Sequence, residues 1–145
     1  MNDRASRLEP LADYAGLREA EAARRLAASA DLIKTKEAEL EQLRGYLAEY
    51  RQRAELDSTD STRWQNARAF LSRLSDAVAY HEAELKKAVE RHRFEADRWR
   101  DSHQRTQALD KVIERSQRER LNTLQRRDQA EVDERAARHN AQLRR

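Results

Sequence analysis

The sequence has 145 residues with two Gly, one Pro and no Cys, and Asp, Glu, Lys and Arg make up 39% of it. So few turn residues and so many charges are typical of long helices rather than of a compact globular domain. The absence of Cys excludes disulfides and thiol chemistry. The longest apolar run, Ala77 to Tyr80, is far shorter than the roughly 20 residues that a membrane-spanning helix needs, so we expect no transmembrane segment.

The first predicted helix covers about residues 10–57. Pro10 favours a start there, because Pro is best tolerated at the first helical position. Late in this segment, apolar residues recur at alternating steps of three and four, which is the period of a coiled-coil seam. These residues are Leu40, Leu43, Leu47, Tyr50 and Ala54. Ser29 and Lys36 interrupt the seam, so we expect looser pairing around them.

A polar break predicts a turn over about residues 57–62, since its Asp, Ser and Thr side chains bond their own backbone. A second helix is expected over about residues 62–143, which contain neither Gly nor Pro. Its seam near the turn has the same period and consists of Trp64, Ala67, Leu71, Leu74, Val78, His81 and Leu85. A loop this short makes the two helices antiparallel neighbours.

The register of the pair follows from folding the chain back at the polar break, so that the numbers of facing residues sum to 121. Leu47 then faces Leu74, and Ala54 faces Ala67. Each pair sets an a position against a d position, as an antiparallel seam requires.

We therefore predict an all-α fold, an antiparallel two-helix coiled-coil hairpin in a single domain over residues 1–145. The first helix covers the second only as far as about residue 111, so the longer second helix overhangs. Such a hairpin buries one narrow stripe and encloses no deep ligand pocket.

Four His residues raise the question of a metal site. His81, His92 and His103 are spaced by eleven residues, which places them about 16 Å apart along a helix, too far for one ion. Two isolated Gly cannot build a phosphate-binding loop. We predict no metal, no cofactor and no enzymatic activity.

The second helix carries a basic segment, which we expect to bind an acidic protein partner. Its cations include Arg91, Arg93, Arg98, Arg100, Arg105, Lys111, Arg115 and Arg118. A nucleic-acid-binding helix is the alternative of another class, because basic side chains neutralise phosphates. Acidic residues alternate with the Arg residues, as on an ion-paired helix surface, so we expect no nucleic-acid partner.

One flank of the predicted hairpin is apolar where charged residues are usual. Two g positions hold Tyr46 and Phe70, and with their neighbours they define a lateral strip drawn from both helices. The strip consists of Leu43, Tyr46, Tyr50, Phe70, Leu74, Ala77 and His81. An apolar strip with aromatics in this place is typical of a docking surface. From spacing alone, a locally widened core explains it equally well.

The segments Gln42–Tyr50, Trp64–Asn66 and Phe70–Leu74, followed by Ala77 and His81, resemble the FliJ family. This family comprises small coiled-coil proteins of the bacterial flagellar type III export apparatus. The resemblance extends over most of the chain. It implies a cytoplasmic, non-catalytic rod, similar to the central stalk of rotary ATPases and peripheral to the inner membrane at the flagellar base.

The resemblance also implies three partners: the hexameric export ATPase, the linker of the export-gate membrane protein, and export chaperones. Family members insert the hairpin end formed by both termini into the ATPase, and their gate-binding positions fall here on the seven residues of the strip. The family often has Gln where this chain has Glu39. The matching stalk protein of a virulence type III secretion system remains the alternative.

Overall fold

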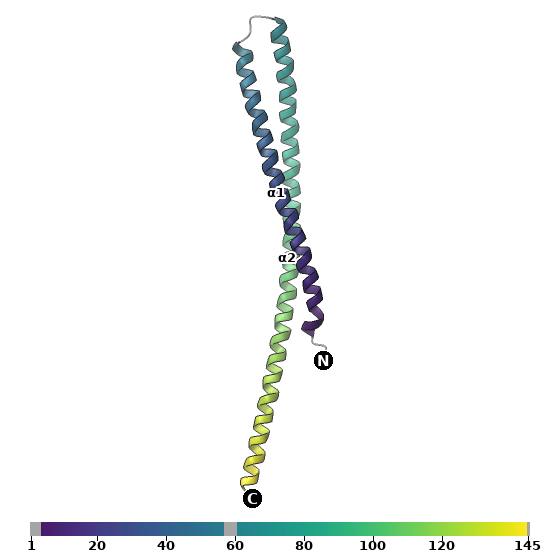
Figure 1. Cartoon of the computed structure of the whole chain (residues 1–145), viewed down its shortest axis with the longest axis vertical. Coiled ribbons are helices and arrows are strands. Elements are labelled where there is room, and N and C mark those ends of the chain that lie inside the picture. Colours follow the sequence, from purple (N-terminus) through teal and green to yellow (C-terminus); the bar gives the residue numbers. More distant parts are fainter. Residues whose placement is uncertain (1–3, 57–60, 145) are drawn as a thin grey trace. The chain divides into compact units, whose positions relative to one another are not determined.

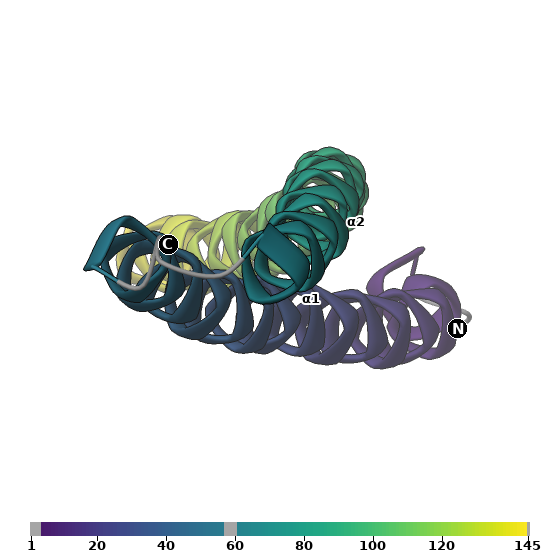
Figure 2. The same ribbon diagram turned by 90° about the horizontal axis from the view of Figure 1, so that it is seen from above.

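The computed structural model describes residues 4–56 and 61–144, and nearly all of them lie in two helices. Helix α1 runs over Arg4–Leu56 and helix α2 over Ser61–Leu143. Figures 1 and 2 show both as uninterrupted ribbons between these bounds. No strand occurs in the described ranges. The predicted all-α helical hairpin is confirmed.

The chain divides into two compact units, each built from a piece of both helices. Unit 1 contains residues 1–19 and 101–145, and unit 2 contains residues 20–100. The expectation of a single domain stays a prediction. None of the helices in the described ranges is long and apolar enough to cross a membrane.

The predicted start of the first helix near residue 10 is wrong, because α1 begins at Arg4 and includes Pro10. Pro lacks a backbone N–H, so the helix forgoes one hydrogen bond at this position. The side chain of Ala5 is only 2% exposed and lines a shared surface groove with Leu121 and Leu124 of α2, and this burial favours the extra turn. The other bounds lie within one residue of the prediction; residues 57–60 of the expected turn lie outside the described residues.

The core of unit 2 is the predicted seam. Leu40, Leu47 and Val78 are buried together. The partly buried residues packed against them are Leu43, Leu71, Leu74 and Leu85. Every member of this cluster belongs to the coiled-coil stripe. The stripe is therefore the apolar contact that holds this part of the hairpin.

A hydrogen bond across the seam confirms the register. Ser29 Oγ lies 2.9 Å from His92 Nδ1, and these residue numbers sum to 121. The Ser29 hydroxyl donates to the Leu26 carbonyl at 2.7 Å, so Ser29 Oγ accepts the Nδ1–H of His92. Ser29 was expected to loosen the pairing; instead it is 7% exposed and bonded to the opposite helix.

Contact with α1 extends farther along α2 than expected. Partly buried positions continue to Ser116, beyond the predicted limit near residue 111. The earlier start of α1 accounts for the difference. Residues 117–143 of α2 are exposed throughout, and those beyond the groove shared with Ala5 agree with the predicted overhang.

Glu95 is a buried acid in the seam of unit 2, with a side chain only 3% exposed. Its Oε1 forms an ion pair with Arg91 Nη2 at 2.9 Å. Its Oε2 is buried without a hydrogen-bond partner among the described residues. A buried carboxylate that is only partly satisfied costs desolvation free energy that a single partner does not fully repay. Its contribution to folding is therefore unfavourable.

We expect Glu95→Leu to raise the free energy of unfolding by about 1 kcal/mol or more, because an apolar side chain fills the site without that penalty. Arg91→Ala should have the opposite effect, since it removes the carboxylate's partner. Thermal melts of the two variants beside the wild type measure both changes. A lower melting temperature for Glu95→Leu would mean that the carboxylate stabilises the seam.

Candidate docking surfaces

The strip predicted from the sequence lies entirely within unit 2. Its aliphatic members Leu43 and Leu74 pack against the buried cluster, and Ala77 and His81 are partly buried. Its three aromatic rings are more open: Tyr46 is 43% exposed, Tyr50 38% and Phe70 43%. The strip therefore combines an anchored base with rings that keep a large contact area available.

The two helices meet within the strip through an aromatic pair. The rings of Tyr50 on α1 and Phe70 on α2 are 4.9 Å apart between centroids, with an edge-on interplanar angle of 66°. Gln42 Nε2 donates a 2.9 Å hydrogen bond to the hydroxyl of Tyr46, which orients this ring. The guanidinium of Arg53 lies 5.5 Å from the centre of the Tyr50 ring. These contacts preorganise the exposed rings, which lowers the entropy cost of binding.

The strip ends at His81, which lies beside Glu39, the residue where the FliJ family often has Gln. His81 Nδ1 lies 3.9 Å from Glu39 Oε2, and Lys36 Nζ lies at the same distance from that oxygen. His81 Nδ1 is buried and has no hydrogen-bond partner among the described residues. Glu39 thus stands next to the strip between two basic groups.

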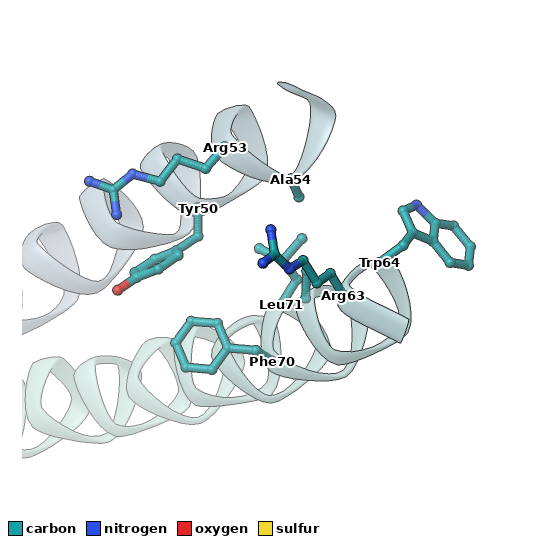
Figure 3. A pocket seen from close by; sticks show the side chains of 8 residues that line it. Tyr50, Arg53, Ala54, Arg63, Trp64, Phe70 and Leu71 are labelled. Carbon is teal, nitrogen blue, oxygen red and sulfur yellow. The ribbon is translucent and has the colours of Figure 1, made fainter. Parts of the chain in front are cut away.

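Beyond Tyr50 and Phe70, toward the turn, unit 2 contains a small cavity of ≈ 110 Å³. It is lined by Tyr50, Arg53, Ala54, Arg63, Trp64, Ala67, Phe70 and Leu71. Figure 3 shows Tyr50 and Phe70 pointing toward one another and Arg63 reaching between the helices, whereas the indole of Trp64 points away. Sequence reasoning did not identify this cavity. The facing pair Ala54 and Ala67 was the available signal.

The predicted basic residues divide between the two units. Arg91, Arg93, Arg98 and Arg100 belong to unit 2, and Arg105, Lys111, Arg115 and Arg118 to unit 1. Three are neutralised within α2: besides the Arg91–Glu95 pair, Arg100 bonds Asp97 at 3.3 Å and Arg118 bonds Glu114 at 2.5 Å. Arg91 and Arg98 also stack on exposed Phe94, at 5.4 and 5.7 Å from the ring centre.

Apart from Arg98, which stacks on Phe94, the remaining cations of the set are available for a partner. Within the described residues, no ion pair engages Arg93, Arg105, Lys111 or Arg115. Three of these four belong to unit 1. The pattern of an ion-paired helix therefore holds for only part of the basic segment.

Unit 1 also contains a side-chain hydrogen bond between the helices. His103 Nδ1 lies 2.6 Å from Glu19 Oε1, and the carboxylate accepts this bond. The bond holds the pKa of Glu19 below its ordinary value of 4.5, and Thr106 adds a smaller effect in the same direction. Among the described residues, no group of three or more His, Cys, Asp and Glu could hold a metal ion.

The lowered pKa of Glu19 predicts a pH-dependent contribution to stability. Because the folded-state pKa lies below the unfolded value, the contribution is complete above about pH 4.5 and is lost as the pH falls through the folded-state pKa. We expect Glu19→Gln to melt below the wild type at pH 6 and close to it at strongly acidic pH. Melting curves that differ equally at both pH values would contradict this linkage.

A helical hairpin with a narrow core, an exposed aromatic strip and unpaired cations is the architecture of a coiled-coil binding protein. The family model described as "Flagellar FliJ protein" matches residues 4–145, so the chain belongs to the FliJ family. None of the curated proteins and none of the solved structures compared with the chain matches it. Membership implies a stalk-like component of flagellar type III export, a family with a structural rather than catalytic role.

Proposed function

We propose that the protein couples the hexameric flagellar export ATPase to the membrane export gate as a non-catalytic stalk, and that it also interacts with export chaperones. It works in the cytoplasm, peripheral to the inner membrane at the flagellar base. The observation that carries this proposal is the strip of unit 2, whose aromatic rings stay exposed although they flank a packed seam.

The strip is assigned to the gate linker. Aromatic side chains that are anchored at the base and open at the face are the usual hot spots of protein interfaces. The seven residues of the strip come from both helices of unit 2. Binding therefore requires the hairpin itself and not either helix alone.

The ATPase is assigned to the cations of unit 1. Arg105, Lys111 and Arg115 have no ion pair within the described residues, and α1 contributes its first turns to the same unit. Unneutralised cations favour an acidic surface and accelerate the encounter with it. Arg118 belongs to this set by position but is bonded to Glu114.

The test is stimulation of purified flagellar export ATPase by the full chain, with binding to the isolated gate linker measured in parallel. Stimulation and linker binding together support the coupling role. Activity only with the components of a virulence secretion system would favour that alternative. Binding to generic duplex DNA with a steep salt dependence, without ATPase stimulation, would assign the basic helix to nucleic acid.

A further inference from the structure

The cavity near the turn has a structural cause in the seam. Ala54 and Ala67 both line it and face one another in the register, so two small side chains meet there, whereas the next layer away from the turn contains Leu71. Neither side chain fills the space between the helices, and Leu71 also lines it. Tyr50 and Phe70, which belong to the strip, line the same cavity and are in edge-on contact with one another.

The charge at the cavity is basic and only partly neutralised. None of its eight lining residues is acidic. Arg53 is occupied, since it bonds Glu49 at 2.7 Å and lies over the Tyr50 ring. The Arg63 side chain has no ion pair among the described residues, and Figure 3 shows it reaching into the space between the helices. The guanidinium of Arg63 is therefore available to a carboxylate beside the apolar lining of the cavity.

We infer that this cavity is an anchor site for an apolar side chain next to a carboxylate, supplied by an acidic segment of a protein partner. The apolar group displaces water from Ala54, Ala67 and Leu71, and the carboxylate pairs with Arg63. The inference rests on the proposed function in one respect, because it extends the gate-binding strip from Phe70 to the turn. It adds Arg63 and the two alanines to the contact surface.

The chemistry of the cavity can be tested without any export protein. The full chain is titrated with 3-phenylpropionate and, separately, with the uncharged 3-phenylpropanol, while NMR follows the methyl signals of Ala54, Ala67 and Leu71. We expect the carboxylate to shift these signals and the alcohol to bind at least several-fold more weakly. Arg63→Gln should remove the difference, whereas the control Arg73→Gln, an exposed arginine on α2 outside the cavity, should preserve it.

Equal shifts with both probes would overturn the assigned charge recognition, and no shift with either would overturn the site. A dimer of the wild type that dissociates in Arg63→Gln, without probe binding, would assign the cavity to a second copy and also overturn the inference. With the gate linker, Arg63→Gln should weaken binding about tenfold. A linker that fails to bind the wild type contradicts the proposed function, while linker binding that ignores Arg63 contradicts only the extension.

Discussion

Leu47→Ala is expected to lower the free energy of unfolding by about 2–4 kcal/mol, because it removes buried methyl groups and leaves a cavity. Leu47 is 8% exposed and belongs to the small cluster with Leu40 and Val78. Unit 2 has few other buried apolar side chains to share the loss. Thermal and denaturant melts measure the change.

The neighbouring aromatic residues should show the opposite pattern. Tyr46→Ala and Phe70→Ala remove rings that are each 43% exposed, so their effect on stability should be much smaller than that of Leu47→Ala. If the strip docks the gate linker, each variant should weaken linker binding by about 2 kcal/mol or more. Phe70→Ala also loses the edge-on contact with Tyr50, worth about 0.5–1.5 kcal/mol, so Tyr46→Ala is the cleaner test.

Phe94→Ala is the matched control, since Phe94 is 50% exposed in the same unit but lies outside the strip. It should leave linker binding unchanged. Melting near that of the wild type with binding lost in Tyr46→Ala supports docking. Strong destabilisation by Tyr46→Ala and Phe70→Ala, with linker affinity retained, would show that the strip is core.

The seam could be predicted because a single narrow stripe holds the hairpin, so the period of the apolar residues specifies both the helices and their register. Leu40, Leu47 and Val78 are buried as that period requires. The observed Ser29–His92 bond has the predicted register. The strip could be identified for the same reason, since it consists of the positions next to the stripe.

Other features depend on the conformation of individual side chains. The start at Arg4 follows from the burial of Ala5 in unit 1, and a single Ala gives no periodic signal. Spacing predicts a weak point at Ser29 because a polar residue interrupts the apolar seam there. It does not specify the hydrogen bond that Ser29 makes to one ring nitrogen of His92. The cavity needs the observed direction of Arg63, which residue identity alone does not determine.

Truncation after Ala108 is expected to abolish stimulation of the export ATPase. The deletion removes Lys111, Arg115 and Arg118 and most of the α2 portion of unit 1. Residues 20–100 keep every contact of their own cluster, so far-ultraviolet circular dichroism should still show a helical hairpin. Binding of the gate linker should persist, because the strip lies wholly within unit 2.

A charge-reversal variant separates lost charge from lost structure. Lys111→Glu with Arg115→Glu in the full chain changes two exposed cations that have no ion pair among the described residues. We expect it to reduce ATPase stimulation nearly as much as the truncation, with an effect that weakens at high salt because ions screen exposed charges. The control Arg138→Glu reverses a cation that is bonded to Glu134 and lies farther along α2, and it should retain most of the stimulation. Full stimulation by the truncated chain would exclude unit 1 as the ATPase-binding end. If only the double charge reversal retained full stimulation, the shape of unit 1 and not the charge of these two cations would account for ATPase binding.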